Sequence, residues 1–209
     1  MERELNNLTE AKSSGPANIP AKFLKELSNE LSKPLAHIFR SSFELERQSS
    51  EWKTANIFPI YMGGALTNAI NYRPVSLTFI CCKIMEAIVK KATMKFLEQG
   101  HLLSDLRHGF RQNRSCLSSL LLSTEHRTRA LDEDGRVDII YTDFKKAFDT
   151  VPHRRLIYKL SEIGIRGRLP AWITDFLTGR SQTVCVEVLR STPTPVLSGL
   201  RAVAIPDLH

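Results

Sequence analysis

Hydrophobic residues in the first half of the chain follow a helical pattern, then an extended one, then a helical one again. Between residues 21 and 46 they recur every three or four positions, which predicts an amphipathic helix that Pro34 splits in two or kinks. The runs Ala55–Ile60 and Arg73–Thr78 favour β-structure and predict a hairpin with a long loop. Residues 83–99 return to the helical spacing.

The second half mixes helical and extended patterns in the same way. It predicts a helix from Ser115 or Cys116 through Leu131 closed by the turn 132–135, a buried strand Val137–Thr142, helices Pro152–Ile163 and Leu169–Leu177, and a half-exposed strand Gln182–Leu189. Trp52 and Trp172 are expected to pack in the core or between subdomains. Because helices and strands are interspersed, we expect an α+β fold.

The net charge and the length of the apolar stretches limit the classes of protein to which the chain can belong. The 209 residues carry 29 Lys and Arg against 22 Asp and Glu, a formal net charge of +7, which permits nucleic acid as a partner without demonstrating it. No stretch approaches the roughly 18 apolar residues of a membrane span, and the first residues do not form a secretory signal. We therefore expect a soluble, intracellular protein, cytoplasmic or nuclear, that does not associate with membranes.

Cysteine spacing argues against a structural metal site. The four cysteines, Cys81, Cys82, Cys116 and Cys185, form no Cys-x-x-Cys pair and have no histidine at ligand spacing. Neither a zinc site nor a disulfide framework is supported, and buried thiols are the expectation.

Asp143 is the strongest candidate for chemistry. It ends the predicted strand Val137–Thr142, where a rigid backbone would bring a carboxylate to the rim, a suitable position for a hard metal ion. The alternative is an aspartate that caps the turn into the next element, and Asp149 fits that alternative better than Asp143 does.

Five motifs occur in one order along the chain and together resemble the reverse transcriptase of non-LTR retrotransposons of the long interspersed element type. They are Asn71-Tyr72-Arg73-Pro74-Val75-Ser76-Leu77-Thr78, Cys82-Lys83-Ile84-Met85-Glu86, His108-Gly109-Phe110-Arg111, the stretch Asp143 to Asp149, and Val151-Pro152-His153. The resemblance implies a right-hand polymerase that copies an RNA template by adding deoxynucleotides to a DNA primer. Its fingers would span about residues 14–135 and the first part of its palm about 136–199.

The resemblance also implies roles for particular residues. Asp143 and the carbonyl of Phe144 match the positions that help to hold two magnesium ions. Phe148 matches the bulky residue that excludes a ribose 2′-hydroxyl, with a packed core phenylalanine as the competing interpretation. Arg73 matches the finger arginine that contacts the incoming triphosphate, and its planar guanidinium suits phosphate oxygens.

The loop from Arg107 to Arg114 is a candidate nucleic-acid contact. Its positions Arg107, Gly109, Phe110, Arg111 and Arg114 form a stretch with three arginines and no acidic residue. The guanidinium groups suit a phosphate backbone, and the phenyl ring suits a base or sugar. Equally, the ring could anchor the loop in the core. His153 is expected to cap a helix rather than act as a general base.

The sequence departs from the family pattern at several places. The acidic residue of the family's Gly-Pro-Asp-Gly is Ala17 here, and its basic finger residues are Tyr61 and Met62. Residues 1–13 form an N-terminal flank, 14–199 a partial reverse transcriptase domain, and 200–209 a divergent tail in place of Val-Pro-Gln-Gly-Ser. The family's second aspartate motif does not occur. The alternative function is therefore a non-catalytic fragment that binds RNA or an RNA–DNA hybrid.

From these departures we predict that the 209-residue polypeptide does not extend a primer. One carboxylate and a carbonyl bind magnesium weakly, because that ion keeps its waters unless several charges converge. The measurement is DNA synthesis on a primed RNA template with magnesium, using Asp143→Asn as the control. Extension that disappears in the control variant would contradict the prediction.

Overall fold

The computed structural model describes residues 1–11, 13–144 and 147–199, and these residues form two compact units. The first takes in residues 1–88 and the described residues from 147 onward, and the second runs from residue 89 to 144. The predicted tail, residues 200–209, lies outside the described residues. Among the described helices, none is long and apolar enough to cross a membrane.

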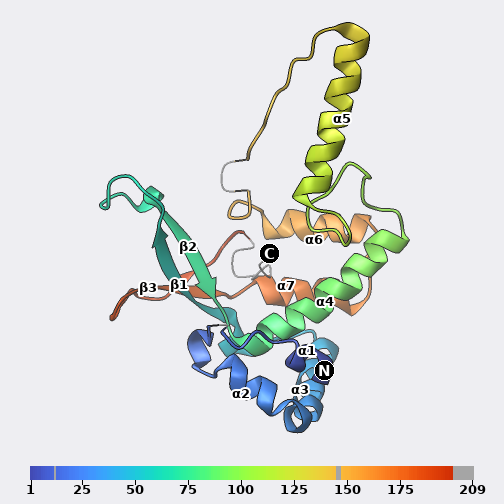
Figure 1. Ribbon diagram of the computed structural model, residues 1–209. Helices are drawn as coiled ribbons and strands as arrows, with labels where there is room; N and C mark the ends of the chain where they lie inside the picture. The colour runs from blue at the N-terminus through green and yellow to red at the C-terminus, as the bar shows by residue number, and fades with distance from the viewer. Residues whose placement is uncertain (12, 145–146, 200–209) are drawn as a thin grey trace. The chain divides into compact units, whose positions relative to one another are not determined.

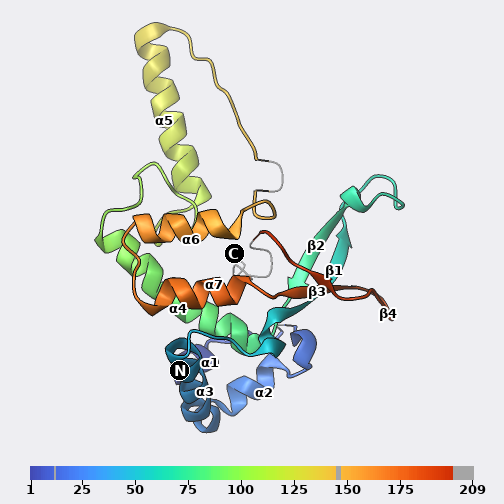
Figure 2. The ribbon, with the colours of Figure 1, turned by 180° about the vertical axis from the view of Figure 1, so that it is seen from behind.

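A mixed sheet lies at the centre of the first unit. Strand β1 (Thr54–Tyr61) pairs antiparallel with β2 (Tyr72–Leu77) and parallel with β3 (Ser181–Val186). The short strands β4 (Leu189–Arg190) and β5 (Thr194–Pro195) both pair with β3. Figure 1 shows β1 and β2 as a long hairpin, and Figure 2 shows β3 beside β1. The predicted hairpin and the α+β class are thus confirmed.

The register of the β1–β2 hairpin places two prolines opposite each other. Pro59 of β1 faces Pro74 of β2, and Asn56 faces Leu77 at the inner end of the pairing. Because proline has no backbone N–H, neither residue donates a hydrogen bond to the sheet at this position. β2 is the terminal strand in the sheet order β2-β1-β3-β4.

Helices and 3-10 turns of three to 17 residues occur along the first 71 residues of the chain. They are α1 (Glu2–Asn6), the 3-10 turn η1 (Gly15–Ala17), α2 (Ala21–Glu26), α3 (Ser28–Glu44), η2 (Ser50–Lys53) and η3 (Ala69–Asn71). The predicted break at Pro34 is wrong. Pro34 lies inside α3, and the chain breaks between α2 and α3 at Leu27. Burial of Leu35 and Phe39, on the turns after Pro34, offsets its missing N–H bond.

Four helices after β2 match the sequence prediction. α4 (Ile80–Gln99) starts in the first unit and ends in the second, which also holds α5 (Cys116–Asp134); α6 (His153–Glu162) and α7 (Arg168–Leu177) belong to the first unit. Ser115 caps α5 through a reciprocal hydrogen-bond pair with Ser118. Gly135 ends α5 in the left-handed conformation, which explains why the sequence predicts the end of a helix at the turn 132–135.

Aromatic side chains fill the core of the first unit, as predicted for Trp52 and Trp172. The Phe39 and Trp52 rings meet edge to face at 5.6 Å, and Trp172 stacks on Phe176 at 5.5 Å. The indole of Trp172 donates a hydrogen bond to Ser42 Oγ at 3.2 Å. These contacts join α3, η2 and α7 into one apolar layer.

A buried cation, Arg180, lies beside this layer. Only 3% of the residue is exposed, its guanidinium lies 4.7 Å from the centre of the Phe176 ring, and it donates to the Phe176 and Trp52 carbonyls at 3.0 and 3.5 Å. Burial lowers the pKa of Arg180. Burial also raises the pKa of the Cys82 thiol, which donates to Glu86 Oε1 at 3.2 Å. Cys82 and Glu86 lie on α4, so the cluster connects that helix to α7 and β3.

Two strand predictions need correction. Val137–Thr142 is irregular and largely exposed, with Ile140 at 87% and Tyr141 at 82%, because no described strand lies alongside to hydrogen-bond with it. The predicted strand Gln182–Leu189 turns back at Glu187, which has a positive φ of 53°, so that β3 and β4 form a tight hairpin.

The turn η1 packs closely against the end of β2. Gly15 has φ +64°, and a Cβ there would overlap the carbonyl oxygen of Thr78, a residue with no exposed surface. Asn18 follows in the left-handed conformation, with φ 53° and ψ 22°. Asparagine tolerates that conformation better than other residues with a Cβ.

We predict that Gly15→Ala lowers the free energy of unfolding by more than about 2 kcal/mol, since it adds both backbone strain and overlap with buried backbone. Gly179→Ala is the matched control, because Gly179 has φ +66° and open space around its Cβ position. The control variant should lose only about 1 kcal/mol. Chemical denaturation measures both, and equal losses would show that the Thr78 contact contributes nothing.

Candidate functional site

Asp143 and Phe144 lie on an exposed, irregular segment of the second unit. Both residues are exposed, Phe144 at 81%. The expected rigid strand end is therefore absent at Asp143, for the same reason that Val137–Thr142 forms no strand. Among the described residues, no group of three or more His, Cys, Asp or Glu side chains is placed to hold a metal ion. The described residues thus do not form a metal site by themselves.

Arg73 and Phe148 belong to the first unit. Arg73 is an exposed residue of β2 and faces Ile60 across the hairpin. Phe148 lies in the turn 147–149 before α6 and is 46% exposed, so it is not a fully packed core residue. The neighbouring motif positions 145 and 146 lie outside the described residues.

Arg111 is tied into the second unit by a two-pronged ion pair. Its Nε and Nη2 donate to the two carboxylate oxygens of Glu98 on α4 at 2.8 and 2.6 Å, and its Nη1 donates to the Ser104 carbonyl at 2.8 Å. Only 10% of the Arg111 side chain is exposed. The hydrogen bond between the two side chains lowers the pKa of Glu98 and raises the pKa of Arg111. This guanidinium holds the loop to the end of α4.

The other two arginines of the loop, Arg107 and Arg114, differ in their contacts. Arg114 pairs with Asp105 at 2.9 Å, and that carboxylate is 92% exposed. Arg107 is exposed and forms no ion pair with a described residue. At Gly109 an added Cβ would meet nothing within 4 Å. Phe110 has a positive φ of 60° and is 40% exposed, so its ring is neither deeply buried nor fully solvated.

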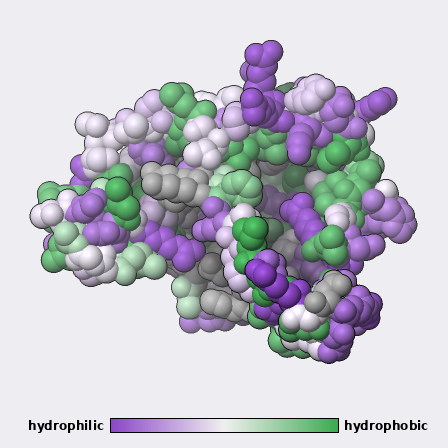
Figure 3. Space-filling view, turned by 90° about the horizontal axis from the view of Figure 1, so that it is seen from above, coloured by the Kyte–Doolittle hydropathy of each residue, from purple (hydrophilic) through white to green (hydrophobic). Residues whose placement is uncertain are grey.

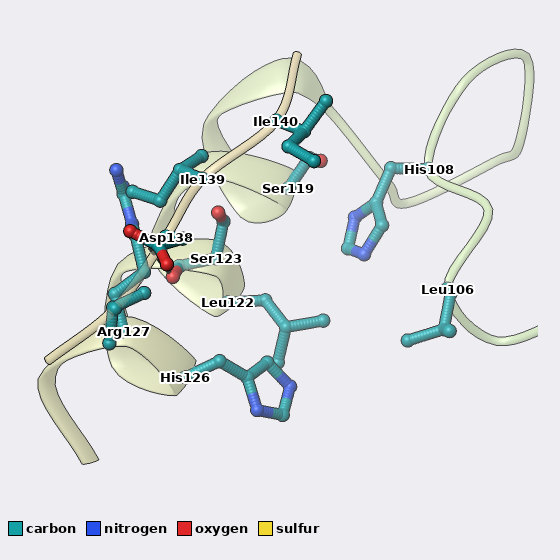
Figure 4. Close-up of a pocket in the computed structure, with 11 residues that line it drawn as sticks. Leu106, His108, Ser119, Leu122, Ser123, His126, Arg127, Asp138, Ile139 and Ile140 are labelled. Atoms are coloured by element: carbon teal, nitrogen blue, oxygen red, sulfur yellow. Dashed lines mark hydrogen bonds between the residues drawn. The ribbon is translucent and has the colours of Figure 1, made fainter. Parts of the chain in front are cut away.

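His108 links the loop to α5. Its Nδ1 lies 2.8 Å from Ser118 Oγ, and the same hydroxyl belongs to the cap of α5. Figure 4 shows His108 and Leu106 on one side of a pocket whose other walls are α5 and the extended segment with Asp138 and Ile139. Sequence reasoning missed this arrangement, because the pocket residues are distant in sequence and form no motif.

The start of α6 also differs from expectation. His153 was predicted to cap this helix, but the N-cap residue is Pro152 and no side chain caps it. The imidazole instead bonds through Nε2 to the carbonyl oxygen of Gly199 at 2.9 Å. A histidine in the first helical turn points back toward the preceding segment, which brings its ring within reach of this carbonyl.

Surface hydropathy on one face adds no further candidate. On the face drawn in Figure 3, hydrophilic and hydrophobic residues are interspersed. Two of the exposed apolar residues, Met62 at 65% and Leu66 at 67%, lie at the turn of the β1–β2 hairpin. Met62 takes the place at which the family pattern has a basic residue.

Comparison with known proteins gives the same family as the motifs indicated. The family model described as reverse transcriptase (RNA-dependent DNA polymerase) matches residues 65–200. The chain is 28% identical over 160 residues, 76% of its length, to the probable RNA-directed DNA polymerase from transposon BS of Drosophila melanogaster. It is 26% identical over 167 residues, 79% of its length, to the RNA-directed DNA polymerase from mobile element jockey of the same fly.

A third relative comes from a beetle. The chain is 27% identical over 136 residues, 65% of its length, to the retrovirus-related Pol polyprotein from type-1 retrotransposable element R2 of Popillia japonica. In each of the three relatives the match covers 18% of the relative's own length.

We predict that acid releases the loop from α4. The lowered pKa of Glu98 means that its pairing stabilises the loop at pH values above the ordinary carboxylate range, and that this stabilisation disappears as the pH falls through the lowered pKa. Glu98→Gln should expose the loop already at pH 7. The measurement is hydrogen exchange of residues 104–114 between pH 7 and pH 3, corrected for intrinsic rates.

Glu125→Gln serves as the control for that experiment, because Glu125 pairs with Arg129 on the solvated surface of α5, with both side chains 65% exposed. The control variant should keep the loop protection of the unsubstituted chain. Unchanged protection in Glu98→Gln would contradict the assigned role of the ion pair.

Proposed function

The chain belongs to the reverse transcriptase (RNA-dependent DNA polymerase) family of non-LTR retrotransposons, and we propose that it supplies the fingers and the first part of the palm of an RNA-directed DNA polymerase. The fingers comprise about residues 14–135 and the palm portion about 136–199, with residues 1–13 as a flank. The observation that carries the proposal is the family match over residues 65–200, which contains every residue assigned a role below.

The proposal gives each of four residues its own role in nucleotide binding. Arg73 contacts the triphosphate of the incoming deoxynucleotide, since an exposed guanidinium can bind two phosphate oxygens at once. Phe148 lies against the sugar and excludes a 2′-hydroxyl, a role compatible with its half-exposed ring. Asp143 supplies a carboxylate and Phe144 a backbone carbonyl to a magnesium ion.

Magnesium remains part of the proposal rather than of the described site. Reverse transcriptases generally use a divalent metal, but the described residues around Asp143 do not fit a magnesium ion unaided, because they offer no third ligand. Asp143 would need carboxylates from outside the described residues to hold the ion.

The loop of residues 107–114 is the proposed contact with the RNA template or the RNA–DNA hybrid. Arg111 and Arg114 already bind Glu98 and Asp105, so binding phosphate through them requires those pairs to open or be shared. Arg107 has no ion pair with a described residue that would have to open first. Gly109 leaves room for the nucleic acid to approach the backbone closely. We therefore expect Arg107 to contribute most to the electrostatic part of binding.

The salt dependence of binding tests this proposal. We expect the 209-residue chain to bind a fluorescent RNA–DNA hybrid with an affinity that falls steeply as salt rises, because phosphate contacts release counterions. Arg107→Gln should reduce the slope of log affinity against log salt by about one. The measurement is fluorescence anisotropy between about 50 and 200 mM KCl.

Arg40→Gln is the matched control, since Arg40 is an exposed arginine of α3 outside the proposed interface. A slope unchanged by Arg107→Gln, or reduced equally by both substitutions, would contradict the proposed interface. Non-catalytic binding is the second candidate function, favoured by the lack of a third metal ligand near Asp143 in the described residues. Hybrid binding without Asp143-dependent primer extension would support it.

A further inference from the structure

The turn that carries Phe148 is fastened to a distant part of the first unit. Ser198 Oγ donates to the Asp149 carbonyl at 3.1 Å, the Gly199 amide donates to the Val151 carbonyl at 3.0 Å, and His153 Nε2 lies 2.9 Å from the Gly199 carbonyl. We call these three hydrogen bonds the 149–199 latch. All of them join the segment 149–153 to residues 198–199.

Position 199 requires a glycine for two independent reasons. Its φ of +87° is strained for any residue with a Cβ. In addition, a Cβ at this position would lie 2.6 Å from the Asp149 carbonyl oxygen and 2.8 Å from the Asp149 Cα. The two backbones therefore touch at a distance that only glycine permits, and the Gly199 residue is buried.

His153 donates one of the three hydrogen bonds of the latch from the first turn of α6. It occupies the first position of α6, and the Gly199 carbonyl can only accept, so Nε2 is the donor. The same glycine donates through its amide and accepts through its carbonyl, which makes the contact two-sided. A movement of residues 198–199 relative to α6 must break the bond to His153, and a movement relative to residues 149–151 must break the other two.

We infer that His153 and Gly199 are positioning residues for Phe148 and thereby set the discrimination between deoxynucleotides and ribonucleotides; this inference rests on the proposed function. The Phe148 ring is 46% exposed, so surrounding side chains enclose only part of it. The backbone of the turn sets where the Phe148 Cβ lies, and the latch fixes that backbone immediately after Phe148.

Hydrogen exchange tests the latch itself. In the 209-residue chain, His153→Ala should speed exchange of the Gly199 amide about fivefold, the effect of losing one hydrogen bond. His153→Gln should restore slow exchange, because the glutamine amide reaches a position similar to Nε2 and also donates. His37→Ala, at an exposed position of α3, is the control and should leave the rate unchanged.

Nucleotide competition tests the consequence. With an RNA–DNA primer–template and magnesium present, dTTP and UTP compete against labelled dTTP. Because the base difference between the two nucleotides is constant, the change in the ratio of their affinities between variants measures the change in sugar discrimination. His153→Ala should lower the ratio by about fivefold at most, because the change cannot exceed the free energy of the lost bond. His153→Gln should restore it. If His153→Ala does not fold, Ser198→Ala takes its place in this experiment. That substitution removes only one bond and should also lower the ratio.

The outcomes separate the latch from the proposed function. Unchanged Gly199 exchange in His153→Ala overturns the latch, and faster exchange with an unchanged dTTP-to-UTP ratio overturns the positioning role. If the unsubstituted chain binds neither nucleotide, the proposed function fails together with the nucleotide part of this inference. The exchange rates then still decide whether His153 holds Gly199.

Discussion

The Arg180 guanidinium is withdrawn from water where η2, α4, α7 and β3 meet, and the first unit is assembled around this charge. Burying a cation is costly unless its surroundings compensate. Here the Phe176 ring, two backbone carbonyls and the nearby Cys82 and Glu86 supply that compensation. These partners come from three segments of the chain, η2, α4 and α7, so the three segments must pack together. This requirement favours one packing arrangement over other equally apolar ones.

A similar constraint operates in the second unit on a smaller scale. The loop of residues 104–114 has few buried apolar residues, and its conformation depends on the Arg111–Glu98 pair and on His108 with Ser118. Positive charge in this loop therefore has a structural role, in addition to the contact with nucleic acid that we propose. A spacing pattern alone does not separate arginines that hold a loop from arginines that reach a ligand.

The elements that sequence analysis predicted correctly are those determined by local signals. The β1–β2 hairpin, α4, α5 with its Ser115 cap, and α6 follow from periodicity and capping residues. The errors occurred where distant neighbours decide: Pro34 stays inside α3 because of burial, and Val137–Thr142 forms no strand because no described partner pairs with it. For the candidate site, motif order identified the family and suggested residue roles that stay predictions, whereas the bond between His153 and Gly199 depends on a contact across 46 positions.

The facing prolines of the β1–β2 hairpin have a consequence for association between molecules. A long terminal strand normally presents a row of donors and acceptors to which a strand of another molecule can add. β2 is such a strand, and Pro74 removes a donor from its middle, directly across from Pro59. An incoming strand would lose register there. The hairpin is thus able to project apolar residues such as Ile60 and Met62 into solvent without offering an uninterrupted template for fibril growth.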